Sequence, residues 1–256
     1  MRQSLRREVE ELFGRSRQAP GTVITEADFS GLPDPVQRSL RYALVSGRGS
    51  IRTVRLKQKG FFRNRKDQGW MPLVAEQYFT TDPPAFLWHG TIRRFPLPPI
   101  SARDTFTDGR GRMRVTLSPG IKLADQRGPE LSQGELLRYL GEIPLFPTAW
   151  LCDYIQWQGI DSRSARADIR HQDVTASAVL HVDERGRVTR TAAERYLEEK
   201  GQHVLRQWSG RFGEYRDIGG LRIPATAEAV WHLPSGDFSY FRAEITEIEY
   251  DRASPY

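Results

Sequence analysis

The chain has 256 residues, of which 38% are hydrophobic, 27% are charged and 11% are aromatic. This composition is typical of a globular protein with a folded core, and it excludes the aromatic-poor, highly charged profile of a disordered chain. Because sheet-rich proteins of this length often form one domain, we expect a single domain over residues 1–256.

Basic residues outnumber acidic residues, 38 against 32, which gives a formal net charge of +6. Five of the basic residues are lysines, so 38 − 5 = 33 are arginines, whose planar guanidinium pairs well with carboxylate or phosphate groups. An anionic partner is one interpretation of this excess. Neutralisation by the acidic residues of the same chain is the other, and we favour it because net charge is weak evidence for a partner.

The single cysteine, Cys152, excludes a disulfide within the chain and a cysteine zinc cluster. Residues 1–18 lack the apolar run of a secretory signal, and no stretch approaches the roughly 18 consecutive apolar residues of a membrane span. We therefore expect a cytoplasmic protein that does not cross a membrane.

Two amphipathic helices are predicted in an N-terminal segment of residues 1–48. The first has apolar residues at helical spacing and ends near Gly14. The second begins with Asp34 as its N-cap and Pro35 at the first helical position, and it ends before Gly47.

Residues 50–250 follow a period of two, which is typical of strands. Leu56 and Phe62 fall on one face of the first such segment, whereas Lys57 falls on the other. Roughly a dozen short strands follow one another, interrupted by one helix near residues 129–141, and connections this short require antiparallel pairing. We predict an α+β fold: a large, curved antiparallel half-barrel sheet with the N-terminal helices and the central helix on its concave side.

Five short segments resemble an uncharacterised bacterial family, a domain of unknown function found mostly in soil bacteria and actinobacteria. The resemblance extends from about residue 24 to residue 250. It implies little about activity, although the element order of the family is similar to the half-barrel of LolA-type lipoprotein carriers, and fold alone does not give function. The segments are Leu32-Pro33-Asp34-Pro35-Val36-Gln37-Arg38, Trp70-Met71-Pro72, Ala75-Glu76-Gln77-Tyr78-Phe79-Thr80-Thr81, Gly134-Glu135-Leu136-Leu137-Arg138-Tyr139-Leu140 and Trp208-Ser209-Gly210-Arg211-Phe212.

Aromatic residues and prolines are dense between residues 70 and 100, as in the lining of a pocket. Our first hypothesis is that the concave face binds an apolar or amphipathic, lipid-like small molecule under the central helix. Glu135 and Arg138 are three residues apart and therefore share one face of that helix. This face contacts the ligand in one interpretation and solvent in the other. The predicted ligand-binding residues are Trp70, Glu76, Tyr78, Phe79, Phe86, Trp88, Arg103, Glu135, Arg138 and Trp157.

The alternative hypothesis is a hydrolase-type enzyme built around Glu76. Its apolar neighbours on one strand face would raise the pKa of this carboxyl group, which suits acid or base catalysis. Arg103 with Asp104, or Glu130 on the central helix, would complete the site. A structural ion pair between Glu76 and Arg103 or Arg138 explains the same residues. The sequence has no nucleophile elbow and no phosphate-binding loop, so we favour a binding protein.

A third hypothesis is binding to nucleic acid or another anionic surface through the cations of residues 52–66, among which Phe61 and Phe62 are interleaved. A solvated outer strand that its cations protect from edge pairing explains the same pattern, and we prefer that interpretation. The five histidines show no metal-binding spacing, so we expect neither a metal nor a cofactor. The cations are Arg52, Arg55, Lys57, Lys59, Arg63, Arg65 and Lys66.

Aromatic residues recur in residues 208–215, for which we predict a structural role. Trp208, Phe212 and Tyr215 share one side if the segment coils, because their spacings are four and three. We expect these rings to cap one end of the core, with Arg211 or Arg216 paired to a carboxylate.

Overall fold

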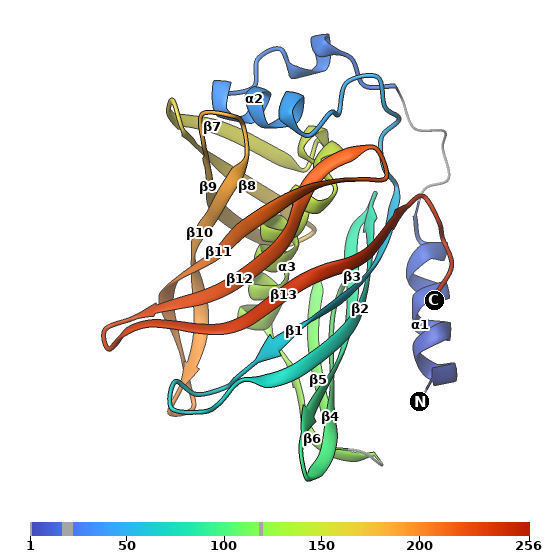
Figure 1. Ribbon diagram of the computed structural model, residues 1–256, viewed down its shortest axis with the longest axis vertical. Helices are drawn as coiled ribbons and strands as arrows, with labels where there is room; N and C mark the ends of the chain where they lie inside the picture. Colours follow the sequence, from blue (N-terminus) through green and yellow to red (C-terminus); the bar gives the residue numbers. More distant parts are fainter. Residues whose placement is uncertain (1, 17–22, 118–119) are drawn as a thin grey trace.

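The computed structural model describes residues 2–16, 23–117 and 120–256. Thirteen strands in these residues form one antiparallel sheet, in the spatial order β6-β5-β4-β3-β2-β1-β13-β12-β11-β10-β9-β8-β7. The sheet curls into a half-barrel around one helix (Figure 1), which confirms the predicted fold class. The strands are β1 (Thr53–Phe62), β2 (Met71–Thr81), β3 (Pro84–Arg94), β4 (Leu97–Thr107), β5 (Arg110–Leu117), β6 (Ile121–Arg127), β7 (Ile155–Asp161), β8 (Ser164–His171), β9 (Val174–Val182), β10 (Val188–Glu199), β11 (Gln202–Ile218), β12 (Leu221–Leu233) and β13 (Gly236–Tyr250).

The strand order explains how the central helix reaches the concave side. Strands β1 and β13 pair in the middle of the sheet, so β6 and β7 form its two edges. The chain segment that connects β6 to β7 contains α3 (Pro129–Glu142) and two short 3₁₀ helices, η2 (Ile143–Leu145) and η3 (Pro147–Leu151). The connection therefore crosses from one edge of the sheet to the other and places α3 inside the curl (Figure 1).

Helix α3 is buried for most of its length because apolar residues occupy more than one of its sides. Leu136, Leu137, Tyr139 and Leu140 are fully buried in the main core, as expected for a helix enclosed by other elements. Each buried leucine contributes about 1.5–3 kcal/mol relative to exposure. The central helix predicted near residues 129–141 is thus confirmed as the element that fills the concave side.

Helix α1 (Arg2–Gly14) lies on the opposite, convex face, contrary to the expectation that the helices fill the concave side (Figure 1). Its apolar residues Leu12 and Phe13 pack with Tyr78 and Leu87 of β2 and β3. These two strand residues alternate away from the concave face, so they provide the apolar surface on which α1 docks.

The second N-terminal helix, α2 (Asp34–Tyr42), packs against β8 and β9, preceded by the short 3₁₀ helix η1 (Glu26–Phe29). Val36 and Leu40 of α2 belong to the main core. Asp34 is the first helical residue and Pro33 occupies the N-cap position, so the prediction of Asp34 as the N-cap is wrong by one residue. None of the helices in the described ranges is long and apolar enough to span a membrane.

Candidate ligand-binding cavity

A cavity of about 1280 Å³ lies on the concave side, between α3 and strands from both halves of the sheet. Its wall is mainly aromatic and aliphatic, with polar groups concentrated on α3 and at the rim. Alternation along each strand explains this composition, because every second side chain points inward. The large apolar lining residues are Phe62, Met71, Trp88, Ile92, Ile100, Met113, Val115, Leu197, Trp208, Phe212, Trp231, Phe238 and Phe241.

Two glycines of α3 face the opposite wall. Gly134 and Gly141 are two turns apart and therefore share a face. A Cβ atom on Gly134 would lie 3.3 Å from Nε of Arg195, and a Cβ atom on Gly141 would lie 3.5 Å from Cη2 of Trp208. The absence of a side chain at Gly134 therefore lets Arg195 of β10 lie against the helix, whereas at Gly141 a Cβ atom would be in ordinary contact with Trp208 of β11.

Arg138 anchors a network of charges at the α3 wall. Its Nη1 donates to Oδ2 of Asp104 at 2.7 Å, and its Nε donates to Oε1 of Glu142 at 3.3 Å. The guanidinium also lies over the rings of Phe86 and Trp88, at 5.1 Å from each ring centre. This cation therefore contacts two carboxylates and two aromatic rings.

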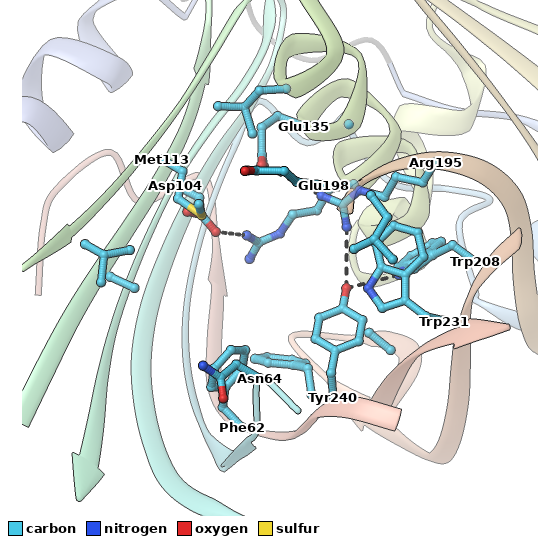
Figure 2. Close-up of a pocket in the computed structure, with 18 of the residues that line it drawn as sticks. Phe62, Asn64, Asp104, Met113, Glu135, Arg195, Glu198, Trp208, Trp231 and Tyr240 are labelled. Carbon is cyan, nitrogen blue, oxygen red and sulfur yellow. Dashed lines mark hydrogen bonds and ion pairs between the residues drawn. The ribbon is translucent and has the colours of Figure 1, made fainter. Parts of the chain in front are cut away.

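Arg195 approaches the same wall from β10. Its Nη2 lies 3.8 Å from Oε1 of Glu135, and its Nη1 donates to the Tyr240 hydroxyl at 3.4 Å. Nε1 of Trp208 donates to the same hydroxyl at 3.0 Å, and Arg195 lies 5.6 Å from the Trp208 ring centre. Figure 2 shows these side chains and Asp104 arranged around one space.

Burial and neighbouring charges shift the pKa values of the acidic and basic groups in this network. Burial raises the pKa of Asp104, and burial together with the nearby Asp104 charge raises the pKa of Glu135 to about 7. Burial alone would lower the pKa of Arg138, but the carboxylates of Glu142, Asp104 and Glu135 raise it above its ordinary value. Arg138 is therefore a permanent cation, whereas Glu135 changes charge near neutral pH.

Five of the residues predicted to bind or react line this cavity. Glu135 and Arg138 lie on α3, and Trp88 of β3 lies beside Arg138. Asp104 of β4 pairs with Arg138. Glu130 also lines it, with Oε2 at 4.0 Å from Nδ1 of a histidine, His203. The sequence pattern thus identified one aromatic residue and four charged residues of the wall, but not Glu142 or Arg195.

Two predicted aromatic residues lie deeper than the cavity. Phe79 and Phe86 point to the concave side, but both are fully buried and pack against each other with ring centres 6.0 Å apart. Phe79 also packs against Tyr139 and Phe146. These rings fill the core beneath α3, so they do not line the cavity.

Three other predicted residues lie on the convex face, because they alternate away from the cavity. The Tyr78 hydroxyl donates to Oε2 of Glu76 at 2.8 Å, and Arg103 Nη1 donates to Oε1 of Glu8 in α1 at 2.8 Å. Glu76 and Asp104 are therefore separated by the sheet. The convergence of Glu76 with Asp104 or Glu130 that the enzyme hypothesis requires therefore does not occur, whereas Arg103 shares the convex face with Glu76 and bonds to Glu8.

The two remaining predicted tryptophans lie outside the cavity wall. Trp70 is between Arg63 and Arg242, whose guanidinium carbons are 4.4 Å and 4.6 Å from its ring centre. Trp157 packs against Trp150 and donates from Nε1 to its carbonyl oxygen at 2.9 Å. Trp157 is held by Trp150, which does not line the cavity, whereas Trp70 lies behind Arg63, which does.

Sequence reasoning missed the cavity wall formed by the last strands. Trp208 was expected to cap the core, but it lies in an extended strand and lines the cavity together with Trp231 and Tyr240. Arg211 does pair with a carboxylate, Asp237, at 2.8 Å. The alternation of aromatic residues in residues 208–241 could have predicted this second wall.

The cations on the convex face of β1 are paired with acidic residues of the neighbouring β13. Nε of Arg55 donates to Glu249 at 2.6 Å and Nζ of Lys57 to Glu247 at 2.9 Å, and Lys59 pairs with Glu244 at 3.1 Å. Strand β1 pairs with β13 on one side and β2 on the other, so the prediction of an outer strand that its cations protect from edge pairing is wrong. Lys57 is partly exposed and Lys59 is exposed, whereas Arg55 is buried beneath the C-terminal residues. Within the described residues, no group of three or more His, Cys, Asp or Glu side chains is arranged to hold a metal ion.

Comparison with known proteins identifies a family without an assigned activity. No curated protein matches the chain. A LolA superfamily protein from Nitrosomonas europaea is similar in structure, with a TM-score of 0.38, 10% identity, and 84% of this chain and 91% of the other covered. A domain described as an outer membrane lipoprotein-sorting protein, from Vibrio parahaemolyticus, has a TM-score of 0.35 and 10% identity over 78% of this chain and 86% of the other. Residues 22–243 match the model of the Family of unknown function (DUF6544), and the chain belongs to that family.

Proposed function

We propose that this protein binds an apolar or amphipathic small molecule in the cavity between α3 and the sheet. The observation that carries the proposal is the cavity itself, whose volume of about 1280 Å³ exceeds the ~300–1,000 Å³ typical of small-ligand sites. Its wall combines many aromatic and aliphatic side chains with charged groups at α3 and at the rim, which suits a ligand that is apolar along most of its length.

The distribution of polar groups favours an elongated ligand with two different ends. Apolar side chains of β1 to β5 and β11 to β13 surround most of the space, whereas Asp104, Glu135, Arg138 and Arg195 are concentrated near α3. An apolar chain would replace water along the strands and gain about 25 cal/mol for each Å² of apolar surface removed from water. A polar group on the same molecule would meet the charged network.

Two neighbouring phenylalanines provide a matched test of this location. Phe62 lines the cavity, whereas Phe61 lies on the convex face and is 48% exposed. Titration with the apolar fluorescent probe N-phenyl-1-naphthylamine should show binding to the unmodified protein. Phe62→Asp should weaken that binding by about tenfold or more, equivalent to about 1.4 kcal/mol, because it places a charge in the apolar wall.

Phe61→Asp is the control and should bind the probe as the unmodified protein does. Equal affinities for both variants would contradict binding in the cavity, as would failure of the unmodified protein to bind the probe.

A further inference from the structure

Two buried carboxylate oxygens at the α3 wall lack a partner. Oδ1 of Asp104 and Oε2 of Glu135 are inaccessible to solvent and have no hydrogen-bond partner among the described residues. The Glu135 side chain is 4% exposed and the Asp104 side chain 14%. A buried acceptor without a donor costs about 1–3 kcal/mol, and more when it is charged, so these atoms favour a group that donates hydrogen bonds.

The cations of the same wall already have acidic and aromatic neighbours. Arg138 is bonded to Asp104 and Glu142 and lies over two aromatic rings. Arg195 contacts Glu135, the Tyr240 hydroxyl and the ring of a tryptophan. A ligand carboxylate or phosphate would compete with the carboxylates that already contact these cations and would be repelled by them, whereas a hydrogen-bond donor would not.

The charge balance of this wall is negative when every group is ionised. Asp104, Glu135 and Glu142 contribute three negative charges, against two positive charges from Arg138 and Arg195. Burial disfavours this uncompensated charge, which agrees with the raised pKa of Glu135, about 7. One additional cation would complete the balance.

We propose that the cavity selects amphiphiles with a protonated amine head, and that the ammonium group lies between the carboxylates of Asp104 and Glu135. An ammonium group has three donors and no acceptor, so it would satisfy both free oxygens once the two carboxylates rotate toward the cavity, and it supplies the missing positive charge. Its hydrocarbon chain extends along the aromatic wall that includes Trp88 and Trp208. This inference rests on the proposed function, because it assigns the head of the same ligand.

Displacement of N-phenyl-1-naphthylamine by dodecylamine, dodecanol and dodecanoate tests the head group at constant chain length. Near pH 8, where Glu135 is ionised, dodecylamine should bind about tenfold or more tightly than dodecanoate, with dodecanol between them. Stronger binding of dodecanoate would overturn the inference, as would equal binding of all three compounds, which would still support an apolar site. No displacement by any of them would refute the proposed function as well.

Charge-removing variants locate the preference. Glu135→Gln and Asp104→Asn should each weaken dodecylamine binding by about tenfold and leave dodecanol binding within about twofold. The control, Glu198→Gln, removes a negative charge from the exposed rim of the same cavity and should leave dodecylamine binding unchanged. An equal loss in the control would show that general electrostatic attraction, and no specific contact, causes the preference.

Discussion

Nη1 of Arg138 lies 2.7 Å from Oδ2 of Asp104, and this ion pair joins α3 to β4 inside the curl of the sheet. Both side chains are largely buried, at 15% and 14% exposure. Desolvating two charges is costly, so such a pair adds little net stability compared with apolar residues, but removal of one partner leaves the other charge buried and alone.

Replacement of Arg138 should therefore be strongly destabilising. We expect Arg138→Ala to lower the free energy of unfolding by about 3–5 kcal/mol, because Asp104 and Glu142 lose their cation. Urea denaturation followed by tryptophan fluorescence measures the loss. Arg163→Ala, which breaks an exposed pair with Glu184, should cost at most about 1 kcal/mol. Similar losses for the two variants would contradict a buried role for Arg138.

Glu135 should contribute to the free energy of unfolding, and this contribution should fall as pH rises. Its pKa is about 7 in the folded protein, against 4.5 in a free side chain, so between these values the folded state holds a proton that the unfolded state has lost. The contribution is complete below about pH 4.5 and disappears as pH rises through about 7. Glu135→Gln should therefore match the unmodified protein near pH 5 and be more stable near pH 8.

Chemical denaturation at both pH values tests this sign. Glu194→Gln, a substitution at an exposed position of β10, is the control and should produce no such difference. A Glu135→Gln protein that is less stable than the unmodified protein near pH 8 would contradict the raised pKa.

Trp208 connects the core to the cavity wall, so its truncation should affect stability and binding together. The side chain is 6% exposed, and its Nε1 donates to the Tyr240 hydroxyl. Trp208→Ala should lower the free energy of unfolding by about 3–5 kcal/mol, as for other large buried aromatic residues. It should also weaken binding of N-phenyl-1-naphthylamine. Unchanged thermal stability with lost binding would show that Trp208 serves the ligand alone.

Helix α1 should detach locally when the half-buried Glu8 is removed. Glu8 accepts hydrogen bonds from Arg103 at 2.8 Å and from Arg114 at 2.7 Å. Glu8→Ala leaves both guanidiniums without this partner, which costs about 1–3 kcal/mol for hydrogen bonds to charged groups. Hydrogen exchange should accelerate in residues 3–14 and remain unchanged in α3. Faster exchange throughout the sheet would show that α1 supports the whole fold, and Glu10→Ala on the exposed side provides the control.

The periodicity of the sequence was sufficient to predict the half-barrel and its central helix, but it was applied inconsistently to the site. Tyr78 and Phe79 are adjacent in β2, so they point to opposite faces, and a single cavity cannot contact both. Arg103 and Asp104 are separated by the same rule: Arg103 meets Glu8 on the convex face, and Asp104 meets Arg138 on the concave face. Strict use of alternation would have removed Glu76, Tyr78 and Arg103 from the expected pocket residues.

Other features of the site depend on contacts between distant elements, which periodicity does not encode. Arg195 reaches Glu135 because β10 passes beside α3, sixty residues later in the chain, where Gly134 leaves room for the guanidinium. The sequence also could not predict on which face of the sheet α1 docks, because the apolar stripe of the helix fits any complementary apolar surface. The surface formed by Tyr78 and Leu87 becomes evident only when the sheet is assembled.

A crystal structure with 12-bromododecan-1-ol would test ligand binding in the cavity most directly. The terminal bromine gives an anomalous scattering peak that locates the chain without assumptions about its density. We predict a peak in the space bounded by α3, Trp88 and Trp208, with the chain along the aromatic wall. A bromine peak only on the convex face, or no ordered bromine at saturating concentration of the compound, would contradict the proposal that the concave cavity binds an apolar chain.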